Sequence, residues 1–487
     1  MKKVLSCALA ICMLLPVFAG CAEGGDTETE PTIQNAEPET EPTEETERFA
    51  WPNYGLDEGL DYAGGDFTML VNAGAAEYFT AEEMNGETLN DALFARNSST
   101  EEALNVRISV VEGNDWGAES VDRFRMDVGA GASSYQLFLT HTCAGGGPLL
   151  LNGCILDMAK LDKLDFSMPW WSSYIIRTLN FNDRVYFCAG DLNLTTIAYL
   201  WVLLFNRQVM TDYGREDPYD LVAEGKWTMD VFREQLNGIS RDLDGDGNVK
   251  LGSDLISLTG SGGLLDVFIF SCGSSVVSVD ESGPVIVIGD EKTQNILERF
   301  VGMMIENDWH LDEGGDLDRV GAFCNNQVYF FGEHIGYLPR FSECEAPYGV
   351  VPYPKYDEAQ PAYYSYAAAE GGILCMPVTL TGEDADRTAA VTQMLAGKNY
   401  ESVTSLYYDT MLKTRYARDQ RTAEMVDICF RGVVYDFGFV YDNWVAGLQS
   451  AMYDLGIKKD TGLQSYVAKK RKGAVKYFDK VYAKFFD

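Results

Sequence analysis

The first 21 residues constrain this chain most, because they predict that everything after them is exported. Two lysines precede an apolar run over residues 4–19, and the run closes on Val17-Phe18-Ala19-Gly20-Cys21. This order is typical of a lipoprotein signal, in which the peptide 1–20 is removed and Cys21 is acylated. The run is shorter than the ~20 residues of a membrane span, which disfavours a signal-anchor helix. We therefore expect a protein held at the extracellular face of the cell membrane by lipid on Cys21.

A strongly acidic segment follows the cysteine. Residues 23–47 hold ten carboxylates and no lysine or arginine. Few apolar side chains are present to offset the entropy of ordering this segment, and its like charges repel one another. We expect a disordered, extended tether within residues 21–63, with the folded part beginning near residue 64.

The charge of the folded part restricts its partners. The formal net charge is −36, and about −28 remains when the two N-terminal lysines and the tether's ten acids are set aside. This excess argues against nucleic acid and anionic lipid as partners. The exception is a basic C-terminal group, which consists of Lys469, Lys470, Arg471, Lys472, Lys476, Lys480 and Lys484. Aromatic residues interleave with it, which predicts an amphipathic helix packed on the globule; a surface facing a membrane or partner is the alternative.

Eight cysteines follow Cys21, and none of them forms a Cys-x-x-Cys pair. Most stand in apolar surroundings, as at Phe187-Cys188 and Leu374-Cys375-Met376. We therefore expect small buried thiols rather than a disulfide framework. Free thiols in an exported protein indicate an oxygen-poor habitat.

Motifs for catalysis are missing from the sequence. The chain has three histidines, and it lacks Gly-x-Ser-x-Gly, His-Glu-x-x-His and Gly-x-x-x-x-Gly-Lys. This disfavours serine triads, zinc hydrolysis and phosphate-loop chemistry, and we assign no catalytic residue. A two-carboxylate glycosidase stays open, because 74 acidic residues always offer a pair.

Short apolar runs alternate with helical spacings along the chain, which is typical of an α/β fold. Strands are predicted at residues 66–72, 106–111, 135–140, 199–205 and 285–288, and helices at 89–103, from Thr228 as N-cap, and at 293–307. The apolar run 195–205 reads as one buried strand. This alternation of strands and helices occurs twice along the chain. About 425 residues follow the tether, and this length suits two domains better than one, so we predict two lobes.

An aspartate-rich loop predicts a structural calcium site. Carboxylates occupy the first, third and fifth loop positions, and Gly247 permits the turn at the sixth. The expected ligands are Asp242, Asp244, Asp246, the carbonyl of Asn248, and Asp254. The twelfth position departs from the pattern, because Ser253 stands there and Asp254 follows it. A polar turn without metal is the alternative, and no catalytic cofactor is predicted.

Several segments in a fixed order resemble the lipoprotein solute-binding proteins of ABC importers, in the family 1 group that includes sugar binders and in a subset typical of gut Firmicutes. The segments are residues 181–187, 190–194, 201–209, 225–228, the aspartate-rich loop, 353–357, 416–419 and 434–436. Together they cover most of residues 66–450.

The resemblance implies a two-lobed clamp of type II, whose chain crosses between the lobes more than once and whose solute lies between them. By this analogy lobe 1 takes residues 64–190 and 360–417, and lobe 2 takes 191–359 and 418–487. It also implies a monomer that delivers its solute to the permease subunits of an ABC transporter.

The candidate solute contacts are polar and aromatic residues near strand ends, the hinge and exposed platforms. They are Glu77, Tyr78, Thr140, His141, Trp170, Trp171, Asp191, Trp201, Arg340, Tyr364, Tyr366 and Trp444. Core packing is the alternative role for each single aromatic residue among them. Acidic charge and abundant aromatic residues favour a neutral oligosaccharide over a peptide or an anion.

The sequence leaves two other function classes open. One is a surface-tethered glycosidase with two carboxylates, and the other is a ligand-sensing clamp that works without transport. We expect a binding protein and no enzyme activity.

Overall fold

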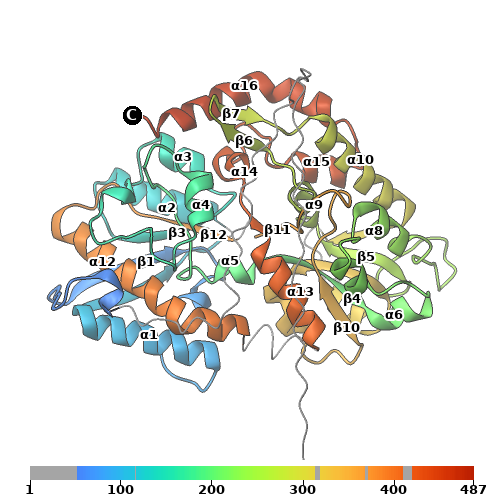
Figure 1. Ribbon diagram of the computed structural model, residues 1–487, viewed down its shortest axis with the longest axis horizontal. Coiled ribbons are helices and arrows are strands. Elements are labelled where there is room, and N and C mark those ends of the chain that lie inside the picture. The colour runs from blue at the N-terminus through green and yellow to red at the C-terminus, as the bar shows by residue number, and fades with distance from the viewer. Residues whose placement is uncertain (1–51, 116, 313–317, 368–370, 410–418) are drawn as a thin grey trace, which may run out of the picture. The chain divides into compact units, whose positions relative to one another are not determined.

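Two separate β-sheets, each covered by helices, organise the chain (Figure 1). The computed structural model describes residues 52–487 except 116, 313–317, 368–370 and 410–418, so Cys21 and the acidic tether lie outside the described residues. Residues from Ala50 onward form one compact unit. The α/β class and the two-lobed arrangement predicted from the sequence are confirmed, while the exact lobe boundaries stay a prediction.

Lobe 1 contains a four-stranded sheet whose centre is parallel. Its strands, in spatial order, are β12 (Gly372–Cys375), β3 (Leu137–His141), β1 (Gly65–Val71) and β2 (Val106–Glu112). β1 runs parallel to both neighbours, and β12 runs antiparallel to β3. β3 and β12 are buried along their whole length, as expected of strands covered on both faces.

The helices of lobe 1 follow the predicted rhythm. They are α1 (Thr88–Leu104), α2 (Ala118–Gly129), α3 (Gly146–Leu151), α4 (Ser173–Leu179) and α12 (Gly382–Lys398), with short 3-10 turns η1 (Pro52–Gly55), η2 (Ala76–Tyr78) and η3 (Met158–Lys160). α1 and α12 pack against each other. The predicted helix 89–103 and strands 66–72, 106–111 and 135–140 are confirmed within two residues.

Lobe 2 contains a mixed five-stranded sheet. Its strands, in spatial order, are β10 (Tyr348–Val351), β4 (Trp201–Asn206), β9 (Val328–His334), β5 (Ile256–Ser261) and β8 (His310–Asp312). β9, β5 and β8 run parallel, whereas β4 is antiparallel to β9 and to β10. All six residues of β4 are buried, which explains why this stretch is continuously apolar.

The helices of lobe 2 and one hairpin surround this sheet. They are α6 (Arg207–Asp212), α7 (Pro218–Ala223), α8 (Met229–Leu236), α9 (Leu264–Ser271), α10 (Glu291–Glu306), α11 (Arg319–Cys324), η4 (Ile335–Phe341), α13 (Gln420–Arg431) and the hairpin β6 (Val277–Asp280) with β7 (Gly283–Ile286). Thr228 caps α8 through its hydroxyl, which accepts the amide of Val231, as the sequence predicted. The predicted strand 285–288 lies two residues earlier in the structure, because β7 begins at Gly283 and ends at Ile286.

The order of the elements along the chain shows that the chain crosses between the lobes three times. It passes from β3 to β4 through α5 (Thr195–Ala198), returns from β10 to β12, and passes from α12 to α13 after the π-helical turn η5 (Asn399–Val403). The short strands β11 (Ser365–Tyr366) and β13 (Val433–Val434) pair in parallel beside these crossings. The prediction of one strand over 195–205 is wrong for its first four residues, which form α5. An apolar run does not by itself separate a buried strand from a buried helical turn.

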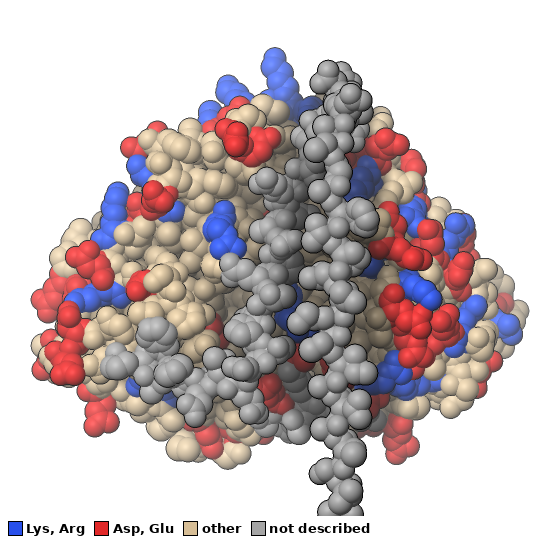
Figure 2. Space-filling model, viewed as in Figure 1, with Lys and Arg blue, Asp and Glu red and all other residues tan. Residues whose placement is uncertain are grey.

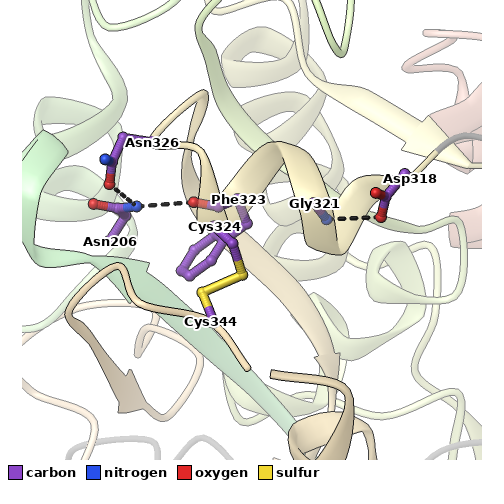
Figure 3. The surroundings of a disulfide bond; sticks show 7 residues. All are labelled: Asn206, Asp318, Gly321, Phe323, Cys324, Asn326 and Cys344. Carbon is purple, nitrogen blue, oxygen red and sulfur yellow. Dashed lines mark hydrogen bonds between the residues drawn. A yellow bond between two sulfur atoms is a disulfide. The ribbon is translucent and has the colours of Figure 1, made fainter. Parts of the chain in front are cut away.

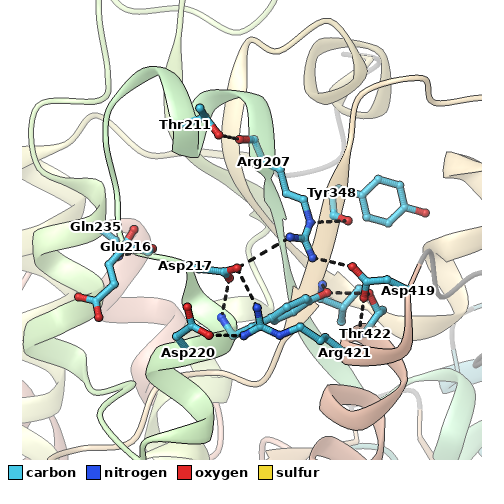
Figure 4. A network of polar contacts seen from close by, with 12 residues as sticks. Arg207, Thr211, Glu216, Asp217, Asp220, Gln235, Tyr348, Asp419, Arg421 and Thr422 are labelled. Atoms are coloured by element: carbon cyan, nitrogen blue, oxygen red, sulfur yellow. Dashed lines mark hydrogen bonds and ion pairs between the residues drawn. The ribbon is translucent and has the colours of Figure 1, made fainter.

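Salt bridges fasten the start of α13 to lobe 2 (Figure 4). Arg421 pairs with Asp217 at 3.1 Å and with Asp220 at 2.6 Å. Arg207 pairs with Asp419 at 2.9 Å. Tyr219 lies between the two guanidinium groups, 4.7 and 4.8 Å from its ring centre. Cation–π contact and charge pairing on partly buried groups therefore fix α13 directly after its crossing.

Six of the eight described cysteines are buried and take part in no disulfide, which confirms the expectation of small core thiols for them. The other two, Cys324 and Cys344, form a disulfide (Figure 3). It joins the end of α11 to the segment after η4, and Phe323 packs against Phe341 beside it. The pair was missed because its partners are 20 residues apart in the sequence and no spacing motif marks them.

The C-terminal segment packs on both lobes. It comprises α14 (Phe437–Asp442), α15 (Ala451–Ile457) and α16 (Leu463–Ala483). α14 and α16 contact α3 of lobe 1, whereas α15 contacts α9 of lobe 2. The amphipathic C-terminal helix predicted from the sequence is confirmed as α16. No helix among the described residues has the length and apolarity that crossing a bilayer requires.

Glycines at the start of α3 permit the contact with α14. A Cβ on Gly146 would collide with the backbone carbonyl of Val440, and a Cβ on Gly147 would collide with that of Tyr441. The glycine-rich turn therefore serves close approach of two backbones.

We predict that Gly146→Ala lowers the free energy of unfolding by about 1–3 kcal/mol, because the methyl group would force the two backbones apart. Gly129→Ala is the matched control, since a Cβ at Gly129 meets nothing within 4 Å and alanine favours the helix. Urea unfolding of both variants measures the difference. Equal stability of the two variants would contradict the tight contact.

Candidate functional site

The carboxyl ends of the parallel strands of both lobes meet the same C-terminal loop. In lobe 1 the amide of Gly145, in the turn after β3, donates to the side chain of Asn443. In lobe 2 a Cβ on Gly262, directly after β5, would lie 2.6 Å from the ring of Tyr453. Ligands of α/β proteins bind beyond the carboxyl ends of strands. The segment from Asn443 to Tyr453, which comprises the loop after α14 and the start of α15, therefore marks the candidate site.

Buried polar groups lie at the lobe 1 edge. Asn72 directly follows β1 and is fully buried, and His141 ends β3 with 4% exposure. A Cβ on Gly117 would lie 3.3 Å from Nδ1 of His141 and 3.7 Å from Oδ1 of Asn72, which places both side chains around one glycine. Within the described residues the carboxamide of Asn72 has no hydrogen-bond partner. A buried amide without a partner is costly, so this group is available to a ligand.

His141 is neutral at physiological pH. Burial lowers the pKa of its imidazole to about 3, and the carboxylate of Asp115 opposes this only in part. A neutral imidazole can donate one hydrogen bond and accept another, which suits a hydroxyl group better than an anion.

Acidic and aromatic side chains follow β1 in the turn η2. Glu77 lies at the surface. The pKa of its carboxyl is raised, mainly by partial desolvation and secondly by the negative charge of the nearby Glu112. The ring of Tyr78 lies edge-on to two other tyrosines, at 6.4 Å from Tyr199 and 6.1 Å from Tyr407. Since Tyr199 directly precedes the lobe 2 sheet, this contact joins the two lobes beside the strand ends.

The lobe 2 edge carries a buried charged group. Trp201 begins β4 and pairs in register with His334, the last residue of β9. The guanidinium of Arg319 lies 3.3 Å from Asp312, which ends β8, and 3.3 Å from Glu333 near the end of β9. Buried charges are retained only when paired in this way. The arrangement offers a cation and two carboxylates at the ends of β8 and β9, the two strands that flank β5.

A row of rings borders this charged group. The imidazole of His334 lies 4.7 Å from the ring of Tyr199 and 5.7 Å from that of Tyr337. Arg340 stacks on Tyr337 at 4.2 Å. Burial lowers the pKa of His334 to about 4, so this histidine is neutral as well.

Asp442 shapes the loop between α14 and α15. It is fully buried, and its two carboxylate oxygens accept four successive backbone amides, those of Ala446, Gly447, Leu448 and Gln449. The loop holds Trp444 at φ 57° with half of its surface exposed. Gln449 donates to the carbonyl of Cys143 in the turn after β3. Four backbone amides around one buried carboxylate thus fix the loop that carries the exposed Trp444, and Gln449 joins this loop to the turn after β3.

The structure brings five of the predicted contacts to the strand ends and the C-terminal loop. They are Glu77, Tyr78, His141, Trp201 and Trp444. Thr140 stabilises the turn after β3, because its hydroxyl donates to the carbonyl of Ala144. Arg340 contacts the row of rings at the lobe 2 edge by donating to the hydroxyl of Tyr337. Asp191 stands at the first crossing, where its carbonyl accepts the side chain of Asn399.

The remaining predicted contacts lie elsewhere. Trp170 and Trp171 are buried in the lobe 1 core, where the indole of Trp171 donates to Gln393 at 3.0 Å. Tyr366 is buried and stacked on Phe270 at 4.4 Å, and Tyr364 lies beside Gly273. Their rings stabilise the fold.

Sequence reasoning missed five residues of the candidate site: Asn72, Asp312, Arg319, Glu333 and Asp442. Asn72 was detectable, because it is the last residue of a predicted strand. The other four have no local signal, since their partners come from distant segments or from the backbone.

The aspartate-rich loop brings three of its predicted ligands together. Oxygen atoms of Asp242, Asp244 and Asp246 all lie within 4.8 Å of one another at the surface. Asp254 is fully buried and instead accepts the amides of Leu243 and Lys250, and these hydrogen bonds lower the pKa of its carboxyl. Its carboxylate organises the loop from within.

We predict that His141 binds no proton between pH 8 and pH 5. Because its pKa is lower in the folded protein than the ~6.5 of an unfolded chain, the unfolded chain binds the proton first as the pH falls. The stabilisation is complete above about pH 6.5, and about 2 kcal/mol of it is lost at pH 5.

NMR tests this prediction through the imidazole signal that disappears in His141→Gln. The signal should not shift over this range, and His141→Gln should reduce the loss of thermal stability on acidification. A titration midpoint near pH 6.5 would contradict the burial argument.

The whole arrangement can be compared with known proteins. A scan against models of protein families finds no match, and a search of curated proteins finds none either. Many solved structures share the fold. The GacH receptor of Streptomyces glaucescens, solved unliganded and with acarbose, superposes with a TM-score of 0.55 at 13% identity, over 85% of this chain and 99% of that chain.

Two further structures agree. The substrate-binding protein Lmo0181 of Listeria monocytogenes, in complex with cycloalternan, has a TM-score of 0.56 at 11% identity, over 85% of this chain and 99% of that chain. A family 1 extracellular solute-binding protein of Bifidobacterium longum subsp. infantis has a TM-score of 0.52 at 12% identity, over 86% of this chain and 99% of that chain. These neighbours are binding proteins. This chain therefore has the two-lobed fold of the family 1 solute-binding proteins of ABC importers.

Proposed function

We propose that this protein captures an extracellular carbohydrate between its lobes and delivers it to the permease of an ABC importer. The observation that carries the proposal is the loop held by Asp442, which contacts the turn after β3 through Asn443 and Gln449 and carries Trp444 with half of its surface exposed. An exposed indole stacks on the apolar CH face of a sugar ring.

The polar groups at the strand ends of the two lobes suit the same ligand. Neutral His141 and the amide of Asn72 both donate and accept hydrogen bonds, and Arg319, Asp312 and Glu333 supply charged partners for hydroxyl groups. The neighbours that hold acarbose and cycloalternan support a saccharide as the solute.

The location follows from the sequence. We infer that peptide 1–20 is removed, that lipid on Cys21 holds the protein at the extracellular face of the membrane, and that it acts as a monomer. A binding role without catalysis agrees with the neighbours. A glycosidase would instead cleave the sugar, and a sensing clamp would bind it without a permease.

Thermal unfolding in the presence of candidate solutes tests the binding role. A ligand at about 100 times its dissociation constant should stabilise the folded state by about 2.7 kcal/mol, which raises the melting temperature by several degrees. We expect the rise with one class of oligosaccharide and not with peptides or amino acids. Chromatography of the recovered sugar distinguishes binding from cleavage.

Trp444→Ala should remove most of this rise while the unliganded melting temperature stays close to the wild-type value, because the indole is half exposed. Phe486→Ala is the matched control, an aromatic residue of similar exposure at the end of the chain. A rise that survives in Trp444→Ala would contradict the platform, and cleaved sugar would favour the glycosidase.

We also propose that the aspartate-rich loop binds calcium with a structural role. The convergence of Asp242, Asp244 and Asp246 supports it, and an ammonium contact from Lys250 to Asp246 competes with it. Calcium should raise the melting temperature above that in chelator, and Asp244→Asn should abolish the difference. Asp230→Asn, outside the loop, is the control. Equal melting temperatures with calcium and with chelator would favour the polar turn.

A further inference from the structure

A stripe of lysines runs along the solvent face of α16. Lys469, Lys472, Lys476 and Lys480 are exposed and recur at intervals of three and four residues, so they lie on one side of the helix over about 16 Å. The opposite side is buried and consists of Leu463, Val467, Ala474, Phe478 and Val481. Figure 2 shows basic side chains projecting from the edge of the molecule that α16 forms in Figure 1.

Among the described residues, Lys469, Lys472, Lys476 and Lys480 form no ion pair with a carboxylate. The neighbouring Lys484, directly after α16, does pair with Asp487. Lysines elsewhere behave differently, since Lys160, Lys163 and Lys226 each pair with a carboxylate.

The spacing of the stripe is unfavourable for the helix itself. Lys472, Lys476 and Lys480 stand four residues apart, and like charges at this spacing repel one another on a helix surface. The chain as a whole has 74 acidic residues and 38 basic ones, so it has enough carboxylates to pair with every lysine. Side chains whose local arrangement destabilises the folded protein are typical of a functional role rather than a structural one.

Apolar side chains border the stripe. Val475 is 41% exposed, and Phe486, just past the end of α16, is 54% exposed. Lysines beside exposed aromatic and aliphatic groups are typical of surfaces that rest on a bilayer, where the cations meet phosphate groups and the apolar groups enter the headgroup region.

We propose that the lysine stripe of α16 docks on the anionic headgroups of a lipid bilayer. The contact is peripheral, because the apolar face of the helix is already used within the protein. Since the rest of the molecule is acidic, attraction is confined to this face and to distances within a Debye length of ~8 Å at physiological salt. The role is additional to solute binding, and it orients the protein on the surface to which its lipid would hold it.

Vesicle flotation tests the proposal with the chain from residue 22 onward, made without an acyl group. The probes are vesicles of phosphatidylcholine with about 30% phosphatidylglycerol, vesicles of phosphatidylcholine alone, and soluble polyphosphate, at about 50 mM and about 500 mM salt. We expect flotation with the anionic vesicles at low salt, and several-fold less at high salt or with neutral vesicles.

The double variant Lys472→Gln/Lys476→Gln should lose most of the flotation, and Phe486→Ala should lose part of it. Lys160→Gln/Lys226→Gln is the matched control, because it removes the same charge from lysines outside α16. Thermal shifts with solute should be unchanged in all these variants, which separates this role from the proposed solute binding.

Three results would overturn the proposal. They are absence of flotation with anionic vesicles, equal flotation of the two double variants, and competition by polyphosphate with no preference for vesicles. The last result would assign the stripe to a soluble polyanion.

Discussion

The contact between the glycine turn of α3 and the backbone of α14 holds the C-terminal segment against lobe 1, and the candidate site depends on it. Gly146 and Gly147 let the carbonyl groups of Val440 and Tyr441 approach more closely than any side chain would permit. α14 ends at Asp442, whose carboxylate folds the next loop around itself. The loop then leads into α15, which packs on α9 of lobe 2. One backbone contact thus positions the exposed Trp444 and connects the strand ends of both lobes.

The site combines neutral hydrogen-bonding groups in lobe 1 with paired charges in lobe 2. Burial keeps His141 and His334 neutral, so their hydrogen bonding does not change across physiological pH. Arg319 pairs with two carboxylates, Asp312 and Glu333, that would otherwise be costly to bury. The tyrosines from residues 78, 199 and 337 form a border of rings between these groups. Together these groups offer hydrogen-bond donors, hydrogen-bond acceptors and aromatic rings, which the carbohydrate we propose as the solute would use.

Elements with strong local patterns were predictable. The strands β1, β2 and β3, the helices α1 and α10, and the cap of α8 at Thr228 all follow from apolar spacing and capping chemistry. The amphipathic helix α16 follows from the alternation of lysines and aromatic residues. Predictions failed where the local pattern is ambiguous. Residues 195–198 are apolar in either conformation, and the partners of the disulfide between Cys324 and Cys344 become neighbours only after lobe 2 has folded.

The sequence alone determined the α/β class, the two lobes and several residues at strand ends, because periodicity and strand-end position are local properties. Glu77, Tyr78 and His141 could be named for this reason. Only the tertiary structure decided that Trp170, Trp171 and Tyr366 belong to the core and that Trp444 is exposed, since an aromatic residue looks the same in either role until its neighbours are known. It also decided the roles of Asp442 and Arg319, whose partners are backbone amides or distant carboxylates. Side chains act through what surrounds them, and those surroundings come from segments far apart in the chain.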